Sequence, residues 1–213
     1  MKVDLIIFDL DGTLADTRQD LTNAVNYVLN KFEKGNLDVD AVTGYVGNGI
    51  NKLLERVLNN PNDNQLQDAR KYFDEFYSKH LMDNTILYPG MLTVLQRFSE
   101  KEMAVISNKV QHYTDNIIDQ LNIRKYFKSV LGGRTDLKKK PAPDPILYIL
   151  EKLFIEPQNA VIIGDTRNDV LAGKAAGIQT CAVTYGFRSI HELKLTEPDF
   201  IVKEAPDLIN ILS

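Results

Sequence analysis

The feature that most constrains the fold is a series of short, largely apolar runs that alternate with helix-like segments. The runs cover residues 3–8, 103–106, 129–131, 160–163 and 180–183. Runs of this length are typical of parallel strands that are buried on both faces. Between the runs, apolar residues at three- and four-residue spacing predict helices, as in Ile146, Ile149, Leu150 and Leu153. We therefore expect a doubly wound, Rossmann-like α/β sheet.

The strand pattern is absent from the middle of the chain. Between residues 17 and 84 the apolar residues follow helical spacing, first along the stripe of Leu21, Ala24, Val25, Val28, Leu29 and Phe32. Further helices are expected at 50–58 and 66–81, separated by an asparagine-rich loop at 59–64. We interpret residues 16–88 as an all-helical cap domain, inserted into an α/β core formed by residues 1–15 and 89–213. Gly132 and Gly133 are expected to form a turn.

Composition excludes several classes of protein. The chain of 213 residues has 25 lysines and arginines against 29 aspartates and glutamates, a net charge of -4. Such a chain spreads no attractive field over nucleic acid or anionic lipid. No apolar run approaches the length of a membrane span, and Asp9 interrupts the first run before it reaches the length of a secretory signal. The single cysteine, Cys181, excludes an internal disulfide framework, so we expect a cytoplasmic protein.

Four aspartates follow two of the expected strands. Asp9 and Asp11 come directly after the first strand, and Asp165 and Asp169 come after the strand at 160–163. Ligands of an open parallel sheet bind beyond the carboxyl ends of its strands, so we expect the four acids to lie together. Like charges held close together need a neutralising partner, and a hard divalent cation with oxygen ligands supplies one. The sequence therefore predicts a magnesium site.

Hydrogen-bond donors are expected at the same edge of the sheet. The strand ending at Ile106 leads to Ser107, Asn108 and Lys109, and Lys140 precedes another helix. Donors that face a metal-binding group of acids suit an anion. A phosphoryl group fits, because its oxygens need cations and donors while one carboxylate attacks in line and a second handles the proton. The residues point to phosphoryl transfer.

These motifs resemble those of the haloacid dehalogenase superfamily, in its phosphatase branch with a helical cap after the first motif. The sequence Asp9-Leu10-Asp11-Gly12-Thr13 is similar to the first family motif, Ser107 to the second, Lys140 to the third, and Gly164-Asp165 with Asp169 to the fourth. The likeness covers nearly the whole chain. Four motifs in the family's order make a chance match very improbable.

The resemblance implies a role for each of these residues. Asp9 would be the nucleophile that forms an aspartyl-phosphate, and Asp11 the acid and base that protonates the leaving oxygen and activates water. Lys140 would neutralise charge on Asp9 and the phosphoryl group. Magnesium would be bound by the Asp9 carboxylate, the Asp11 carbonyl, Asp165 and, directly or through water, Asp169. The phosphate-binding set would be Gly12, Thr13, Ser107, Asn108 and Lys140.

Within the superfamily, several phrases are similar to phosphoglycolate phosphatases. They are 88–91, 107–109, 140–145 and 185–188, together with the cap stretch 45–49. Two departures are Ser107 in place of the commoner threonine, and Arg18-Gln19 in a segment that often carries proline. Selection among substrates is expected to come from the cap, with Tyr45, Gly47 and Asn48 near the leaving group and Arg18 near the hinge as a partner for a second anionic group. The first substrate to expect is 2-phosphoglycolate.

Other functions stay open on the sequence alone. Inorganic pyrophosphatases and phosphatases of sugar or nucleotide phosphates share most of these phrases, and a phosphomutase of the same fold would pass the phosphoryl group to a sugar hydroxyl. A dehalogenase would leave the acid Asp11 idle, and a receiver module would accept phosphate on Asp9 without turnover. The histidines His80, His112 and His191 receive no catalytic role. The expected partner is a small phosphorylated metabolite, and the expected state is a monomer or homodimer.

Overall fold

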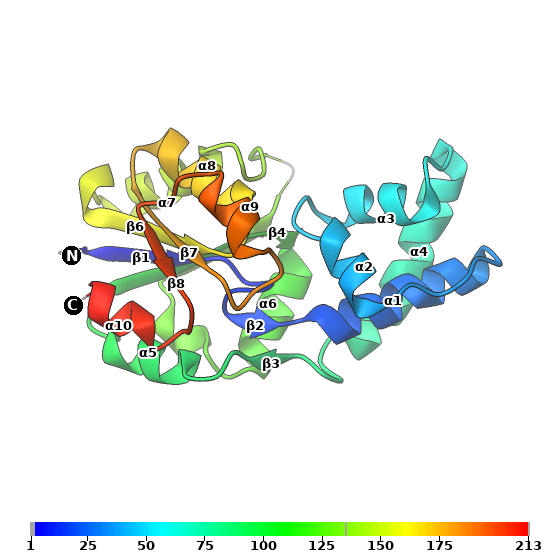
Figure 1. Cartoon of the computed structure of the whole chain (residues 1–213), viewed down its shortest axis with the longest axis horizontal. Helices are drawn as coiled ribbons and strands as arrows, with labels where there is room; N and C mark the ends of the chain where they lie inside the picture. The colour runs from blue at the N-terminus through cyan, green and yellow to red at the C-terminus, as the bar shows by residue number, and fades with distance from the viewer. Residues whose placement is uncertain (1–2, 135, 213) are drawn as a thin grey trace.

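The predicted parallel sheet is present in the computed structural model, which describes residues 3–134 and 136–212 (Figure 1). Residues 1 and 213, the outer ends of the expected core, lie outside this description. Six strands pair in parallel in the order β5-β4-β1-β6-β7-β8. They are β1 Leu5–Phe8, β4 Glu102–Val110, β5 Ser129–Gly133, β6 Ala160–Gly164, β7 Gln179–Val183 and β8 Phe200–Val202. The doubly wound fold class is confirmed.

Both faces of the sheet are covered by helices, which explains why the strand runs are apolar throughout. Along β1, Ile6 and Phe8 belong to one hydrophobic cluster, and Leu5 and Ile7 belong to another on the opposite face. The core helices are α5 Met91–Arg97, α6 Gln111–Gln120, α7 Asp144–Leu153, α8 Arg167–Ala176, α9 Ile190–Lys194 and α10 Asp207–Leu212, with 3-10 turns η1 Arg124–Tyr126 and η2 Pro157–Asn159. Buried apolar residues of α5, α6 and α10 join the first cluster. Those of α7 join the second together with Ala172 and Ala176 of α8, while Val170 of α8 belongs to a third, smaller cluster.

Four helices form a separate body beside the sheet (Figure 1). They are α1 Arg18–Lys31, α2 Val39–Tyr45, α3 Ile50–Leu58 and α4 Asp63–His80. The chain leaves the core through β2 Ala15–Asp16 and returns through β3 Ile86–Leu87, and these two strands pair antiparallel. We call residues 16–88 the cap. Figure 1 shows this helical body at the end of the molecule where the core strands point.

A buried aspartate ties the two connections of the cap together. Asp20, in the first turn of α1, is fully buried. Its carboxylate accepts hydrogen bonds from the backbone N–H groups of Asn84 and Thr85, at 2.8–3.0 Å, and from both of their side chains at 2.8 Å. Because these donors belong to the returning chain, the exit and the re-entry of the cap form one joint.

Three details differ from the sequence prediction. The turn predicted at Gly132 and Gly133 was wrong, since both lie in β5, and a Cβ at Gly132 would lie only 2.5 Å from the Cα of Gln111. Strand β4 continues past Ile106 to Val110 with an irregular register, so 107–109 are part of this strand. Helix α2 and strand β8 were not predicted, because each is short and buries few apolar side chains. In the described part of the chain, no helix combines the length and apolar character needed to cross a bilayer.

Candidate active site

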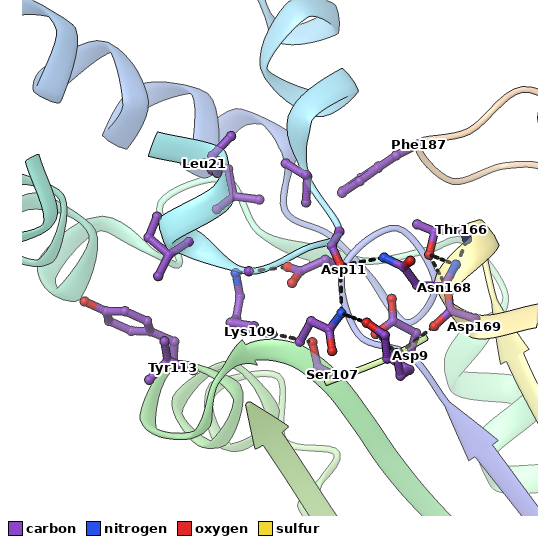
Figure 2. Close-up of a pocket in the computed structure, with 18 of the residues that line it drawn as sticks. Asp9, Asp11, Leu21, Ser107, Lys109, Tyr113, Thr166, Asn168, Asp169 and Phe187 are labelled. Carbon is purple, nitrogen blue, oxygen red and sulfur yellow. Dashed lines mark hydrogen bonds and ion pairs between the residues drawn. The ribbon is translucent and has the colours of Figure 1, made fainter. Parts of the chain in front are cut away.

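Asp9, Asp11, Ser107, Lys140 and Asp169 line one cavity between the core and the cap, and Asp165 lies beside it (Figure 2). The cavity encloses about 650 Å³ of atom-free space, including its open mouth. Asp9 follows β1, Asp165 follows β6, and Ser107 lies in β4, so three neighbouring parallel strands deliver these side chains to one edge. The sequence prediction that the acids and donors converge is therefore met by the geometry.

Lys140 is the centre of the ionic network. Its side chain is buried, and Nζ donates to Asp9 Oδ1 at 2.8 Å, to Asp169 Oδ1 at 2.6 Å and to the carbonyl oxygen of Ile106 at 2.6 Å. Burial lowers the pKa of the Lys140 ammonium, but the charges of Asp169 and Asp9 outweigh this effect and raise the pKa overall. All three ammonium hydrogens are thus used, and the lysine stays charged between two carboxylates.

The nucleophile candidate Asp9 occupies a strongly perturbed environment. Burial raises the pKa of the Asp9 carboxyl to about 7; the Lys140 ammonium opposes this rise, while Asp169 adds to it. One oxygen, Oδ1, is held by Lys140, and in the described part of the chain no hydrogen bond reaches Oδ2. The carboxylate of this cavity-lining residue is therefore oriented through Oδ1.

Asp9, Asp165 and Asp169 form a group that could hold a metal ion. Each of these buried residues offers a carboxylate oxygen, and the three oxygens lie within 4.8 Å of one another. Burial raises the pKa of Asp165 well above its usual value, and the charge of Asp9 adds to the rise. Three hard oxygen donors that repel one another in a buried site suit Mg²⁺. The residues present therefore fit the magnesium ion that the sequence predicts.

Asp165 is held by contacts with two segments, one that follows β1 and one that follows β7. Its Oδ2 accepts the N–H of Phe187 at 2.7 Å, and its Oδ1 accepts the hydroxyl of Thr13 at 3.3 Å. Gly12 adopts φ of +85°, and a Cβ there would lie 2.2 Å from Asp165 Oδ2. Gly12 and Thr13 thus contact the metal group, although the sequence predicted them as phosphate-binding residues.

Asp169 has two structural roles at once. Its Oδ2 accepts the N–H of Thr166 at 3.0 Å and the Thr166 hydroxyl at 2.7 Å, which completes a capping box at the start of α8. Its Oδ1 accepts from Lys140. The capping box fixes the Asp169 carboxylate where it accepts from Lys140. Asp169 therefore stabilises the start of α8 and also belongs to the ionic network of the site.

Asp11 lies at the joint between core and cap. Its Oδ1 accepts the hydroxyl of Thr17 at 2.7 Å and lies 3.1 Å from Lys109 Nζ. Thr17 precedes the first residue of α1, so the acid contacts the connection on which the cap is carried. This position suits an acid that meets a leaving group held between the two domains.

Ser107 and Asn108 are both in the cavity wall but differ in their contacts. Ser107 Oγ accepts the N–H of Lys109 at 3.2 Å, and its own hydroxyl hydrogen can turn toward a phosphoryl oxygen. Asn108 donates from Nδ2 to the carbonyl oxygens of Gly47 and Lys140, at 2.8 Å each. Its amide hydrogens fasten the cap loop and the Lys140 loop, which is a different task from the predicted phosphate contact.

Core side chains hold residues 43–48 of the cap, which are the end of α2 and the loop that follows it, mainly through backbone carbonyl oxygens. We call this segment the cap loop. Asn168 Nδ2 donates to Gly47 O at 3.0 Å and to Asn48 Oδ1 at 3.3 Å. Arg188 donates to the carbonyl oxygens of Thr43, Gly44 and Val46 at 2.8, 3.2 and 2.5 Å. We call these contacts, with that of Asn108, the carbonyl latch. Sequence reasoning gave no role to Asn168 and Arg188, since nothing in the sequence brings 43–48 to them.

Of the four residues predicted to select the substrate, two lie at the cavity and two do not. Gly47 lines the cavity, and Asn48 contacts Asn168 beside it. Arg18 makes a two-pronged ion pair with Asp16, at 2.9 and 2.6 Å, and Tyr45 is 36% exposed. Neither Arg18 nor Tyr45 is among the described residues that line the cavity.

The fold and the site define a class of protein: a parallel α/β core with a helical cap inserted after its first strand, and a lysine-paired aspartate beside further buried carboxylates. Residues 6–183 match the family model for haloacid dehalogenase-like hydrolases, and the chain belongs to this family. The family expected from the sequence motifs is confirmed.

Relatives that match nearly the whole of this chain are named as phosphoglycolate phosphatases. The chain is 35% identical to a phosphoglycolate phosphatase of Aquifex aeolicus over 98% of this chain and 96% of that protein. It is 34% identical to phosphoglycolate phosphatase 1 of Pseudomonas aeruginosa over 96% of this chain and 78% of that protein. The crystal structure of a predicted phosphoglycolate phosphatase from Haemophilus somnus has a TM-score of 0.94 at 26% identity, covering 99% of this chain and 98% of that one.

Proposed function

We propose that this protein is a magnesium-dependent phosphatase that hydrolyses a small phosphate monoester through an aspartyl-phosphate on Asp9. The observation that carries the proposal is the contact of Lys140 with Asp9 at 2.8 Å, within a buried group that also contains Asp165 and Asp169. A carboxylate that lines a cavity and is oriented by a buried ammonium is suited to attack phosphorus. The relatives named above support the same class of reaction.

The proposed reaction proceeds in two displacements. A carboxylate oxygen of Asp9 forms a bond to phosphorus as the bond between phosphorus and the ester oxygen breaks, and Asp11 gives its proton to that leaving oxygen. Water then attacks the phosphorus of the aspartyl-phosphate, its proton passes to Asp11, and the Asp9 carboxylate leaves. Asp11 has its proton again at the end, and the products are the alcohol and inorganic phosphate.

The remaining residues bind and orient the phosphoryl group. Lys140 offsets negative charge on Asp9 and on the phosphoryl oxygens, and Ser107 donates its hydroxyl to one of those oxygens. Magnesium, held by Asp9, Asp165, the Asp11 carbonyl and Asp169, would supply further positive charge for the transferring group. The carbonyl latch keeps the cap over the cavity, which limits the access of bulk water to the acyl-phosphate.

The first substrate to test is 2-phosphoglycolate, because relatives that match nearly the whole of this chain are named for it. The competing functions are an inorganic pyrophosphatase, a phosphatase of sugar or nucleotide phosphates, and a phosphomutase. The expected partner remains a small phosphorylated metabolite, with the protein as a cytoplasmic monomer or homodimer. Buried Cys181 fits a reducing compartment.

The test combines turnover, trapping and metal removal. Wild-type protein with Mg²⁺ is expected to release phosphate steadily from p-nitrophenyl phosphate and 2-phosphoglycolate, and Asp9→Asn is expected to release none. Rapid acid quenching followed by mass spectrometry of the wild type should find phosphate on the peptide that contains Asp9. EDTA should abolish turnover and Mg²⁺ should restore it. Steady activity of Asp9→Asn, with contamination excluded, contradicts the covalent mechanism, and transfer of phosphate to an added sugar instead of water favours the phosphomutase.

A further inference from the structure

The half of the cavity that faces the cap is formed mostly by hydrocarbon. Leu21 of α1, Ile50 and Leu53 of α3, and Phe73 of α4 line it, together with Val110 of the core. An alcohol leaving group must enter this half, because Asp9 and Asp169, the two carboxylates that pair with Lys140, lie on the other side of the cavity from Leu21 and Tyr113 (Figure 2). The few polar groups in this wall therefore decide which leaving groups are recognised.

Lys109 places a positive charge in this wall. Figure 2 shows the side chain rising from β4 toward the cap. Its Nζ lies 3.1 Å from Asp11 Oδ1 and donates to the hydroxyl of Tyr77 at 2.9 Å. A lysine side chain is ordinarily protonated near neutral pH, so this group is a charged donor. An ammonium has three N–H donors, and its contacts with the described residues use two.

Tyr77 supplies a second donor at the same place. It belongs to α4, is fully buried and lines the cavity. Its oxygen accepts from Lys109, so its own hydrogen is available for another group. Burial raises the pKa of Tyr77 to about 12, which keeps the phenol protonated near neutral pH. The cap and the core thus each contribute one donor to a single point.

The neighbouring polar side chains in this wall are committed elsewhere. The Tyr113 hydroxyl donates to Asp74 at 2.7 Å, and the amide of Asn168 holds the cap loop. Arg18, which the sequence suggested as the partner of a second anion, pairs with Asp16 outside the cavity. Among the described lining residues, the lysines and arginines are Lys109 and Lys140. Lys140 has all three ammonium hydrogens in use, so Lys109 is the cation open to the leaving group.

We propose that Lys109 and Tyr77 together bind a carboxylate on the leaving group, and that these two residues are the ones by which the protein selects a 2-hydroxy acid ester over an ester without the carboxylate. This inference rests on the proposed phosphatase function. Lys109 contacts the same Asp11 that meets the ester oxygen, so the carboxylate belongs on the carbon that bears that oxygen. A carboxylate in a buried site needs such a charged partner. The apolar wall leaves room for a hydrocarbon substituent on the same carbon, as in 2-phospholactate.

The test compares substrates with and without the carboxylate. Kinetics with 2-phosphoglycolate are compared with ethyl phosphate, and kinetics with 2-phospholactate with isopropyl phosphate, for wild type, Lys109→Met and Tyr77→Phe. Lys138→Met is the matched control, because Lys138 is an exposed lysine of the loop before Lys140. Wild type should prefer the carboxylate-bearing member of each pair in kcat/KM. Lys109→Met should reduce this preference about 10- to 100-fold, and Tyr77→Phe about 3- to 10-fold, the sizes expected for a charged and a neutral hydrogen bond.

Two further measurements separate the possible outcomes. Glycolate should bind magnesium-loaded wild type and Lys138→Met more tightly than Lys109→Met in titration calorimetry, and Tyr77→Phe provides the test if Lys109→Met does not fold. Equal losses for all four esters in both variants, or a wild type without preference for the carboxylate, would overturn the proposal. Failure of the phosphatase function itself is a different result, namely a wild type that does not hydrolyse p-nitrophenyl phosphate with Mg²⁺.

Discussion

Replacing Asp9 by Asn should remove activity. In the metal-free protein near neutral pH it should also increase the free energy of unfolding. The pKa of Asp9 is raised from 3.8 to about 7, chiefly by burial. Below pH 3.8 the carboxyl is protonated in both the folded and the unfolded chain. As pH rises from 3.8 to 7, the unfolded chain ionises while the folded one keeps the proton, so the free energy of unfolding falls. The stability associated with this group is therefore present at low pH and lost by about pH 7.

The size of this effect follows from the pKa difference. Each pH unit between the two pKa values changes the free energy of unfolding by about 1.36 kcal/mol, which gives on the order of 4 kcal/mol over the whole interval. Asn cannot ionise, so Asp9→Asn does not undergo this loss. The free energy of unfolding of the variant minus that of the wild type should grow by about 4 kcal/mol between pH 4 and pH 8.

Urea unfolding in EDTA, followed by circular dichroism at several pH values, measures this difference. The comparison with Asp9→Asn reports the ionisation of Asp9 together with its effect on Asp165, whose pKa the charge of Asp9 raises. Saturating Mg²⁺ should reduce the difference at pH 8, since the ion binds the ionised carboxylates of the folded wild type. A difference between the two proteins that does not vary with pH would refute the reasoning that burial of Asp9 opposes its ionisation.

Three other substitutions test separate parts of the site. Lys140→Met should destabilise the protein by about 3–5 kcal/mol and slow turnover about 10²- to 10³-fold, because it leaves two buried carboxylates without their ammonium; urea unfolding and kinetics of wild-type quality would contradict this. Asp11→Asn should slow hydrolysis of alkyl phosphates about 10²- to 10⁴-fold and of p-nitrophenyl phosphate less, because nitrophenolate needs little protonation; equal losses argue against the acid role. Arg188→Ala should increase KM and speed hydrogen exchange in residues 43–48, because three carbonyl contacts are lost; exchange at the wild-type rate in that segment would show that Arg188 does not hold the loop.

The sheet was predictable because its strands are buried on both faces. Burial of every residue of β1 makes that strand visible as an apolar run, and the acids follow such runs directly. Helix α2 has no comparable signal, since only Val42 and Thr43 are buried in it. Strand β8 has one fully buried residue, Val202, at the edge of the sheet. Short elements at an edge are defined by the surface that they meet, which sequence periodicity does not record.

Contacts between core and cap were the least predictable part of the site. Arg18 was expected to face an anion because it lies near the hinge, but Asp16, two residues earlier, pairs with it. Arg188 belongs to a phrase noted in the sequence, yet its role depends on the carbonyl oxygens of residues 43–46, which are distant in the chain. Lys109 was noted beside Ser107, and only the position of Tyr77 in α4 gives it a specific task. Such roles follow from packing between domains.

The carbonyl latch separates what holds the cap from what faces the substrate. Asn108, Asn168 and Arg188 contact mainly backbone carbonyl oxygens of residues 43–47, and nearly every amino acid at those positions would offer the same acceptor. Side chains of this segment can therefore be exchanged while closure is retained, except at buried Thr43 and at Gly47, which adopts φ of +117°. Libraries that vary residues 44–46 and Asn48, or that graft this segment from a relative, should yield many closed and folded enzymes. Substrate preference in such a scaffold can diverge without a redesign of the catalytic core.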